Sequence, residues 1–411
     1  MPEISRRGQI VPPSPIRKLV PLADAAKARG IHVYHVNIGQ PDLPTPEPMR
    51  RAVARYAAEV YAYAPSPGIR ECREALHAYF CRSLGIDFAL EDVMITTAGS
   101  EAIQLALGTC LEPGQTVLVP EPLYPNYLGF AALLGVEVRP IPCELETGYH
   151  LPPDLERFVV PGTRAILFAN PGNPTGAVFT REELERVAEL AARHDLFVIA
   201  DEVYREIVYE RPSLSILQME EIGERAIVID SLSKRYSACG IRIGALVSRN
   251  RAVMEAFGRF AMARLSSPAL GQVAAAAIAE IPDDYFDTVR ATYRARRDAV
   301  VTALRTIPGV ECYVPEGALY TMARLPVADS EDFTRFLLTS FELDGETTML
   351  TPGNGFFVTP GRGVDDVRVA FVLQEAHMRR AMEIMAAGLA AYRARALNGA
   401  AAGTRQMPSK T

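Results

Sequence analysis

The sequence predicts a three-layer α/β domain, built around a large, doubly wound and mostly parallel sheet, together with a smaller α+β domain. From about residue 48 to 310, short apolar runs rich in Val and Ile alternate with amphipathic segments. Within the runs apolar and polar residues do not alternate, so these strands are expected to be buried on both faces, as in parallel sheets covered by helices. This order of elements is typical of a doubly wound domain. The character of the sequence changes near residue 305, which indicates the second domain.

Size and charge bound the possible functions. With 411 residues, 49% of them hydrophobic, the chain is long enough to bury the cores of a large and a small domain. The net charge is −6, and the arginines are spread evenly along the chain. Without a basic block, nucleic acid and anionic membranes are not expected as partners, and no apolar run reaches the length of a membrane span.

The cysteines and histidines indicate neither disulfides nor a metal site. None of the six cysteines forms a C-x-x-C pair and most lie among apolar or helical residues, so reduced thiols are expected. The N-terminal stretch MPEISRRGQIVPPSP lacks the apolar region of a signal peptide, which together with the thiols predicts a cytoplasmic protein. The six histidines lack the spacing of metal ligands.

The predicted elements divide the chain into four segments. Residues 1–47 form an N-terminal arm, proline-rich over VPPSPIRKLVPLAD, and part of the smaller domain; such an arm often packs on a neighbour. Residues 48–305 are expected to form the large domain, in which Thr180 and Glu183 predict a capping box. Its strands are expected at 92–98, 115–121, 137–143, 164–171, 196–202, 226–233 and 243–248, with helices at 101–111, 180–195 and 252–265. Residues 306–395 form the small C-terminal domain, and 396–411 a disordered tail.

Polar and small residues follow the predicted strands, where ligands bind in parallel α/β sheets. Gly99 and Ser100 open a helix whose free N–H groups and dipole suit a phosphate, although a plain N-cap at Ser100 fits as well. Asn173 lies in the rigid loop NPGNPTG, where its amide could contact a ligand or form an Asx turn. Asp201 ends an apolar strand, where an unpaired carboxylate costs free energy. It could pair with a protonated ring nitrogen or cap the following segment.

The stretch SLSKRYSACGIRIG, at 231–244, holds an unusual lysine. Only four of the 43 Lys and Arg residues are lysines, and Lys234 alone lies in the middle of the chain. Lysine can lose its proton and condense with a carbonyl, which arginine in practice cannot do; an ordinary salt bridge is the alternative. Arg242 lies eight residues further on and suits bidentate phosphate contact.

One ligand, pyridoxal phosphate, accounts for all of these strand ends. Its aldehyde requires Lys234, its phosphate requires Ser100 and Arg242, and its ring nitrogen requires Asp201. Because the carboxyl ends of parallel strands meet at one edge of a sheet, these residues are expected to gather around a single molecule.

With these residues taken together, the chain resembles the aspartate/aromatic type of class I/II aminotransferases, which belong to the fold-type I pyridoxal-phosphate family. The resemblance covers roughly residues 10 to 390. It rests on the motifs NIGQPDLPTP, YAPSPGIRECREAL, TAGSEA, EPLYPNY, NPGNPTG, DEVY, SLSK followed by Arg242, and VRVAF. It implies that an amino group is exchanged between an L-amino acid, of aspartate or aromatic type, and a 2-oxo acid, with 2-oxoglutarate as acceptor. It also implies a homodimer with shared active sites.

The resemblance further implies roles for individual residues. Lys234 would bind the cofactor's aldehyde and move the substrate's Cα proton, and Asp201 would hold the pyridine nitrogen. Tyr124 would stack on the ring, while Tyr204 and Asn173 would bind its hydroxyl. The phosphate would be bound by Gly99, Ser100, Ser231, Ser233, Arg242 and, from the neighbouring subunit, Tyr63. The substrate's α-carboxylate would be bound by Arg368, with Gly39 and Asn173 nearby.

Three alternatives require other features. The S-x-x-K pattern at 231–234 also fits penicillin-binding enzymes, but the sequence contains neither S-D-N nor K-T-G. A non-enzymatic regulator with this fold would need a DNA-binding domain, for which no room is expected before residue 30. A pyridoxal-phosphate-dependent lyase or cyclase acting at Cα or Cβ would share every cofactor contact, and a pyruvate or ammonia product would identify it.

The choice of substrate side chain stays open in the sequence. In this family, enzymes that act on dicarboxylates often hold the distal carboxylate with an arginine of the partner subunit. The matching position here is Met262, and Arg264 lies two residues away. Aspartate, aromatic and neutral amino acids therefore stay open, with the N-terminal arm or Arg324 as other sources of positive charge.

Overall fold

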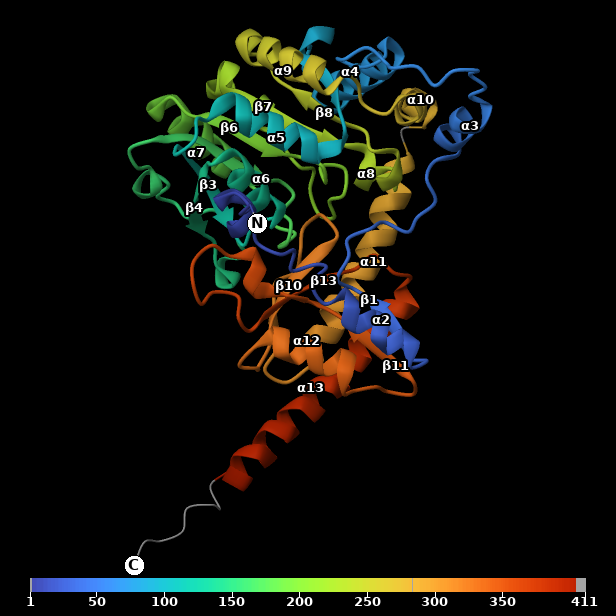
Figure 1. The fold of residues 1–411 in the computed structure, drawn as a ribbon, viewed down its shortest axis with the longest axis vertical. Helices are drawn as coiled ribbons and strands as arrows, with labels where there is room; N and C mark the ends of the chain where they lie inside the picture. Colours follow the sequence, from blue (N-terminus) through green and yellow to red (C-terminus); the bar gives the residue numbers. More distant parts are fainter. Residues whose placement is uncertain (1, 283, 404–411) are drawn as a thin grey trace, which may run out of the picture.

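A seven-stranded sheet forms the centre of the computed structural model, which describes residues 2–282 and 284–403 (Figure 1). The strand order is β2-β8-β7-β6-β5-β3-β4, and the pairs are parallel except the two that β8 makes. The strands are β2 (Val93–Thr96), β3 (Thr116–Glu121), β4 (Glu137–Pro142), β5 (Thr163–Ala169), β6 (Phe197–Asp201), β7 (Ala226–Ser231) and β8 (Gly244–Val247). The predicted doubly wound, mostly parallel sheet is confirmed.

Helices cover both faces of this sheet, and successive residues of its inner strands are apolar and buried on both faces. On β6, Val198 and Ala200 join a core that includes residues of α4, α7 and α10, whereas Ile199 joins a core that includes residues of α5, α6 and α9. The bounds are α4 (Arg70–Leu84), α5 (Ala98–Cys110), α6 (Asn126–Leu134), α7 (Arg181–His194), α9 (Arg251–Arg264) and α10 (Ala269–Ala276). Burial on both faces explains the apolar runs in the sequence.

The predicted capping box begins α7. The Thr180 hydroxyl accepts a hydrogen bond from the Glu183 N–H at 3.2 Å, and the Glu183 carboxylate accepts one from the Thr180 N–H at 2.7 Å. Each side chain thus satisfies a backbone donor that the start of a helix leaves free. The remaining helices around the large sheet are α1 (Arg6–Ile10), α3 (Glu47–Arg55) and the short α8 (Leu232–Arg235).

Both ends of the chain contribute to a second group of strands and helices below the large sheet in Figure 1. Strands β12, β13, β10 and β9 form an antiparallel sheet, and β1 pairs in parallel with β11. The strands are β1 (His32–His35), β9 (Glu311–Cys312), β10 (Tyr320–Arg324), β11 (Glu346–Met349), β12 (Thr351–Pro352) and β13 (Asp366–Ala370). The helices are α2 (Val20–Ala28), α11 (Tyr285–Thr306), α12 (Ser330–Thr339) and α13 (Glu375–Gly403). The N-terminal segment is fixed there because Leu19 and Ala23 pack with Leu338.

Helix α13 is longer than the sequence predicts. It includes residues 396–403, for which we expect a disordered tail, and the rest of that predicted tail lies outside the described residues. The extra turns follow from an alanine-rich stretch, ARALNGAAAG, because alanine has the highest helix propensity.

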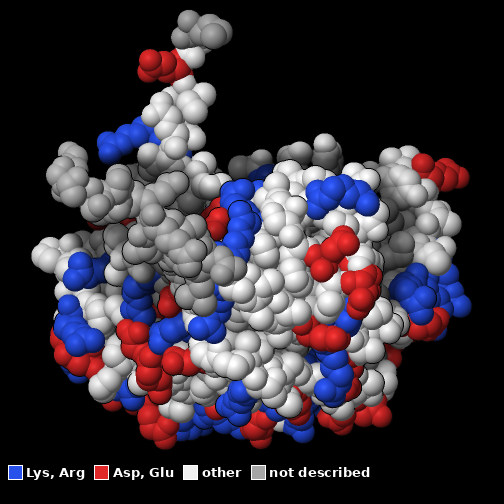
Figure 2. All heavy atoms as spheres, turned by 90° about the horizontal axis from the view of Figure 1, so that it is seen from below, with Lys and Arg blue, Asp and Glu red and all other residues white. Residues whose placement is uncertain are grey.

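The surface carries both signs of charge. On the face shown in Figure 2, acidic and basic side chains are interspersed, without a broad area of one sign. In the part of the chain that the structure describes, no helix has both the length and the apolar composition needed to cross a membrane.

Candidate functional site

A cavity of about 370 Å³ opens at the carboxyl ends of the central strands, beside the smaller sheet. Every site residue predicted from the sequence lines it, except Tyr63. These residues are Gly39, Gly99, Ser100, Tyr124, Asn173, Asp201, Tyr204, Ser231, Ser233, Lys234, Arg242 and Arg368. The topology brings them together because β5, β6 and β7 are parallel neighbours whose ends lie at the same edge of the sheet.

Lys234 lies in the one-turn helix α8, directly after β7. Ser231 is the N-cap of this helix, and its hydroxyl accepts a hydrogen bond from the Ser233 N–H. The Lys234 Nζ reaches across the cavity and donates a 2.8 Å hydrogen bond to the Gly39 carbonyl. A Cβ at position 39 would lie 1.8 Å from the Tyr320 hydroxyl, so only glycine lets the backbone approach this closely. The amine is therefore held at the cavity by one neutral acceptor.

Small residues, hydroxyls and a guanidinium surround one end of the cavity. Helix α5 begins there with Ala98 at φ 59°, followed by Gly99 and Ser100, so its free N–H groups face the cavity. The Ser231 hydroxyl donates to the Ser233 hydroxyl at 2.9 Å. Arg242, with φ 56°, lines the same cavity and donates to the Cys239 carbonyl at 3.1 Å. N–H groups, hydroxyls and a guanidinium are the donors that bind phosphate in proteins.

Asp201 ends β6 with its side chain buried. Its carboxylate accepts hydrogen bonds from the Tyr127 hydroxyl at 2.7 Å and from the Val203 N–H at 3.4 Å. Burial, the largest influence, raises the pKa of Asp201 to about 6, while the two hydrogen bonds act to lower it. A carboxylate in this setting is stabilised by a cationic partner, such as a protonated ring nitrogen.

The neighbouring Glu202 takes no part in the cavity. Its carboxylate faces the other way, where it pairs with Arg205 at 3.0 Å and accepts from the Ser215 hydroxyl at 2.8 Å. The two adjacent carboxylates of the DEVY motif thus have different environments.

Arg368, on β13, is buried and has no carboxylate partner among the described residues. Its guanidinium donates to Asn173 Oδ1 at 3.0 Å and to the Asn37 carbonyl at 2.6 Å, and the rings of Tyr320 and Phe356 lie 4.3 and 5.1 Å away. Burial, the largest influence, lowers the pKa of Arg368 from its ordinary value. A buried cation held only by neutral groups is suited to bind an anion that enters the cavity.

Three tyrosines form the wall between these charged groups. The hydroxyls of Tyr204 and Tyr320 are 2.8 Å apart, and the Tyr124 hydroxyl accepts a hydrogen bond from Asn126 at 2.7 Å. Burial raises the pKa of Tyr124 to about 12 and that of Tyr204 well above its usual range, so both are neutral near pH 7. They are available as hydrogen-bond partners and as a surface for a flat ring.

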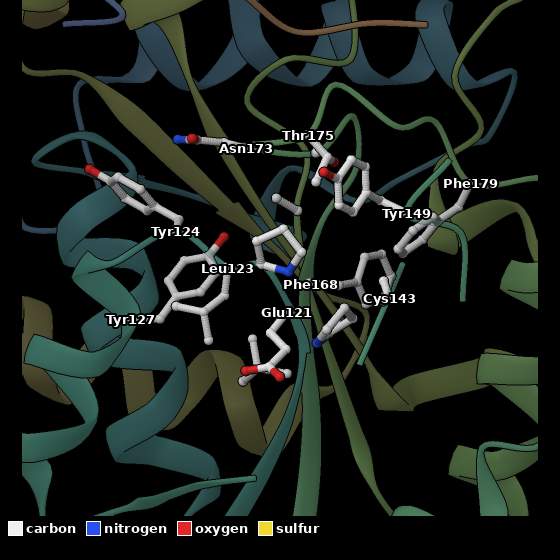
Figure 3. Close-up of a pocket in the computed structure, with 15 residues that line it drawn as sticks. Glu121, Leu123, Tyr124, Tyr127, Cys143, Tyr149, Phe168, Asn173, Thr175 and Phe179 are labelled. Atoms are coloured by element: carbon white, nitrogen blue, oxygen red, sulfur yellow. The ribbon is translucent and has the colours of Figure 1, made fainter. Parts of the chain in front are cut away.

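A second, smaller cavity of about 30 Å³ lies behind Tyr124 and Asn173, and is large enough for one water molecule (Figure 3). Figure 3 shows Tyr127 between Tyr124 and Glu121, facing the rings on the opposite wall. The Glu121 carboxylate accepts hydrogen bonds from the N–H groups of Val358 and Thr359 at 2.8 and 3.1 Å. It thus ties the end of β3 to the loop that precedes β13.

Sequence reasoning missed several residues of the site. Tyr127 lies three residues after Tyr124 in PLYPNY, in the first turn of α6, whereas Tyr124 precedes that helix. Asn37, Tyr320 and Phe356 come from the smaller sheet and its connections, and only the folded chain places them beside Arg368.

Three residues considered from the sequence lie elsewhere. The Tyr63 side chain is 80% exposed and does not line the cavity; its predicted role concerns a neighbouring subunit. Met262 is 65% exposed. Arg324, considered as a source of positive charge, is paired with Glu146 at 2.9 Å and Glu311 at 3.3 Å, outside the cavity.

Comparison with known proteins establishes the class. The family described as "Aminotransferase class I and II" matches residues 31–385. The chain therefore belongs to the class I and II aminotransferases, which depend on pyridoxal phosphate. The donor set of the cavity fits this cofactor: an amine for its aldehyde, a phosphate cradle, and the Asp201 carboxylate for its ring nitrogen.

Individual relatives differ in the substrate that they are named for. The chain is 32% identical to aromatic-amino-acid aminotransferase 2 of Thermococcus litoralis, over 93% of this chain and 97% of the relative. It is 30% identical to aspartate/prephenate aminotransferase of Thermus thermophilus, over 92% and 97%. Its fold matches alanine aminotransferase of Pyrococcus furiosus with a TM-score of 0.86, at 30% identity over 94% of this chain and 99% of that one.

Proposed function

We propose that this cavity is the active site of a transaminase for L-amino acids of aspartate or aromatic type, with 2-oxoglutarate as acceptor. One observation carries the proposal: a lysine, a buried carboxylate and a buried arginine without a carboxylate partner among the described residues face one cavity. This set provides one group for the cofactor's aldehyde, one for its ring nitrogen and one for an amino acid's carboxylate.

Residues that line the cavity would hold the cofactor. Lys234 would bind its aldehyde, Asp201 its ring nitrogen, and Tyr204 with Asn173 its hydroxyl, while Tyr124 would contact its ring. The phosphate would be bound by Gly99, Ser100, Ser231, Ser233 and Arg242, with Tyr63 from the neighbouring subunit. When bound, pyridoxal phosphate supplies an electron-withdrawing ring that stabilises negative charge at the substrate's Cα.

The protein's own residues orient the substrate and move its proton. Arg368 binds the α-carboxylate with its guanidinium fork, beside Asn173 and Gly39, and so fixes the direction of the Cα–H bond. Lys234 Nζ would be the base that accepts the Cα proton. Its present acceptor, the Gly39 carbonyl, keeps the amine at the cavity.

We further propose that the protein forms a homodimer and acts in amino-acid metabolism in the cytoplasm. Large apolar side chains are exposed along residues 60–63 and 260–270, including Val60 at 73%, Tyr61 at 68% and Leu265 at 51%. Exposed apolar patches of this kind mark contacts between proteins. All six cysteines are unpaired, as expected in a reducing compartment.

The test uses the purified protein loaded with pyridoxal phosphate. Amino acids are added one at a time, and conversion of the cofactor to its amine form is followed by absorbance; 2-oxoglutarate should then restore the aldehyde form. The Lys234→Arg variant keeps the charge and should lose this cycle. Failure of every amino acid to convert the cofactor would contradict transamination, and stoichiometric release of pyruvate or ammonia would identify the lyase alternative.

A further inference from the structure

Glu121 is a polar strand end that the proposed function does not use. It is the last residue of β3, at the edge of the sheet where Asp201 ends β6, but it does not line the main cavity. Its side chain is 0% exposed. Because a buried carboxylate costs free energy unless its oxygens are bonded, the partners of Glu121 indicate what it does.

The partners belong to residues 353–365, which connect β12 to β13. One oxygen of Glu121, Oε2, accepts both hydrogen bonds, from the Val358 N–H at 2.8 Å and from the Thr359 N–H at 3.1 Å. Arg362 Nη1 lies 3.6 Å from the other oxygen, Oε1. The carboxylate therefore holds the backbone of this connection against the large sheet.

A third hydrogen bond continues this contact. The Leu123 N–H donates to the Phe356 carbonyl at 2.7 Å, so three hydrogen bonds join residues 121–123 to residues 356–359. We call these three bonds the β3 clamp. Residues 357–365 lie outside the helices and strands, so contacts with other segments have to fix their position.

The clamped segment carries Phe356, which packs against Arg368. The Phe356 side chain is completely buried, and its ring lies 5.1 Å from the Arg368 guanidinium. Arg368 is otherwise held by two hydrogen bonds to neutral oxygens and by the Tyr320 ring, and its Nε has no hydrogen-bond partner among the described residues. Since an aromatic face attracts a guanidinium, Phe356 helps to fix the plane in which Arg368 presents its N–H groups.

A surface contact holds the far end of the same connection. Arg362 donates to the Glu144 carboxylate at 2.6 Å, and the Glu144 side chain is half exposed. Exposed ion pairs contribute little, because water solvates both groups. The buried hydrogen bonds of Glu121 are therefore expected to fix the segment, and the pair of Arg362 with Glu144 serves as a comparison.

We propose that Glu121 is a positioning residue for the carboxylate site. Through the β3 clamp it holds Phe356 against the Arg368 guanidinium, and so sets the affinity for the substrate's α-carboxylate. The proposal rests on the proposed function, in which Arg368 binds that carboxylate, and deepens it by naming a residue that touches neither substrate nor cofactor.

Binding of unreactive acids to the holoenzyme tests the proposal without turnover. The probes are maleate and 3-phenylpropionate, which share a carboxylate and differ in the rest of the molecule, and their binding is followed calorimetrically. In Glu121→Ala both dissociation constants should rise by a similar factor, on the order of tenfold, as expected for loss of a buried cation–π contact. The dissociation constant of pyridoxal phosphate should change much less, since Glu121 lies outside the cavity that would hold it.

Two further variants separate the hydrogen bonds of Glu121 from its charge. Glu121→Gln removes the charge but keeps an oxygen, and because both N–H groups donate to a single oxygen, it should retain most of the wild-type affinity for the acids. Glu121→Asp keeps the charge but shortens the side chain, and should weaken acid binding in the same direction as Glu121→Ala. If Glu121→Ala does not fold, the comparison of these two variants carries the test.

The matched control is Glu144→Gln. It removes a carboxylate beside Arg362 but leaves the β3 clamp intact, so acid binding should stay at the wild-type value. The proposal is overturned if Glu121→Ala keeps the wild-type affinity for either acid, or if it weakens binding of pyridoxal phosphate as much as that of the acids. It is also overturned if Glu121→Gln loses as much affinity as Glu121→Ala, if Glu144→Gln has the same effect, or if the wild-type protein binds neither acid.

Turnover distinguishes failure of this inference from failure of the proposed function. In Glu121→Ala the KM for the amino acid and the KM for 2-oxoglutarate should both rise, because both molecules bind through an α-carboxylate, while kcat changes much less. If the wild-type holoenzyme transaminates no amino acid, the proposed function is wrong. If it does, and both KM values are insensitive to Glu121, only the assignment of Glu121 is wrong.

Discussion

The Tyr127 hydroxyl donates a 2.7 Å hydrogen bond to Oδ2 of Asp201, and both side chains are buried. The bond joins α6 to the end of β6 behind the proposed position of the cofactor's ring. Because burial favours the neutral acid and this hydrogen bond favours the carboxylate, the two effects oppose each other in setting the pKa of Asp201 at about 6. Tyr127 therefore acts as a positioning residue that keeps Asp201 charged near neutral pH.

Replacing Tyr127 with Phe should weaken cofactor binding most at low pH. Loss of the hydrogen bond raises the pKa of Asp201 above 6, so that more of it is protonated near neutral pH and unable to accept the ring's N–H. We expect the dissociation constant of pyridoxal phosphate at about pH 7 to rise on the order of tenfold. A fluorescence titration between about pH 5.5 and 8.5 measures it.

The control is Tyr149→Phe. Tyr149 lines the small cavity on the wall opposite Tyr127 (Figure 3), and the side-chain hydrogen bonds of Asp201 go to Tyr127 and Val203 rather than to Tyr149. Its variant should show the wild-type pH dependence. If Tyr127→Phe does the same, the hydrogen bond has no influence on the cofactor.

Arg368→Lys should lower kcat/KM for every amino acid by a similar factor. All substrates share the α-carboxylate, and an ammonium cannot reproduce the forked contact or the hydrogen bonds to Asn173 and the Asn37 carbonyl. We expect a loss on the order of hundredfold for both aspartate and phenylalanine. Steady-state kinetics with the two donors measures it. A loss confined to aspartate would show that Arg368 reads the side chain instead.

The strand ends could be predicted from the sequence because polar residues there interrupt apolar runs. Asp201 and Lys234 stand out directly after β6 and β7, and parallel neighbours place them at one edge. The antiparallel direction of β8 could not be predicted, since a buried strand has the same apolar pattern in either direction. The role of Tyr127 could not be predicted for a related reason. An aromatic residue on a helix is typical of the core, and only the hydrogen bond to Asp201 in the folded chain links Tyr127 to the site.

Contacts between segments far apart in the chain were also beyond the sequence. Arg368 is held by Asn37, which is 331 residues away, and Arg17 reaches the cavity because α2 packs on α12. From the sequence, both Arg324 and the N-terminal arm could supply positive charge to the substrate. In the structure Arg324 forms ion pairs with Glu146 and Glu311 on the surface, outside the cavity.

Arg235→Met should destabilise the protein strongly. Arg235 follows Lys234 and is 2% exposed; its guanidinium donates to Oδ2 of Asp230 at 2.7 Å and lies 4.3 Å from the ring of Tyr79. Removing one partner leaves a buried carboxylate unpaired, which costs roughly 3–5 kcal/mol. Urea denaturation of the cofactor-free protein measures it.

Two further variants test whether the loss of stability comes from burial of the unpaired carboxylate. The double variant Arg235→Met with Asp230→Leu removes both charges and should recover most of the lost stability. Arg70→Met breaks an ion pair with Glu74 on the surface of α4 and should change stability little, because water solvates both groups. Equal effects of Arg235→Met and Arg70→Met would contradict the argument from burial.

His150 and Glu183 should make stability depend on pH. The hydrogen bond between His150 Nδ1 and the Glu183 carboxylate, 2.9 Å long, is the largest cause that raises the pKa of His150 above its ordinary 6.5. A histidine whose pKa is raised on folding contributes stability that is fully present below about pH 6.5 and is lost as the pH rises through the folded value. A double-mutant cycle with His150→Gln and Glu183→Gln should therefore give a coupling on the order of 1 kcal/mol at about pH 5.5, decreasing by about pH 9. Denaturation of the four proteins at both pH values measures it, and a coupling that grows with pH would contradict the pairing of a charged histidine with Glu183.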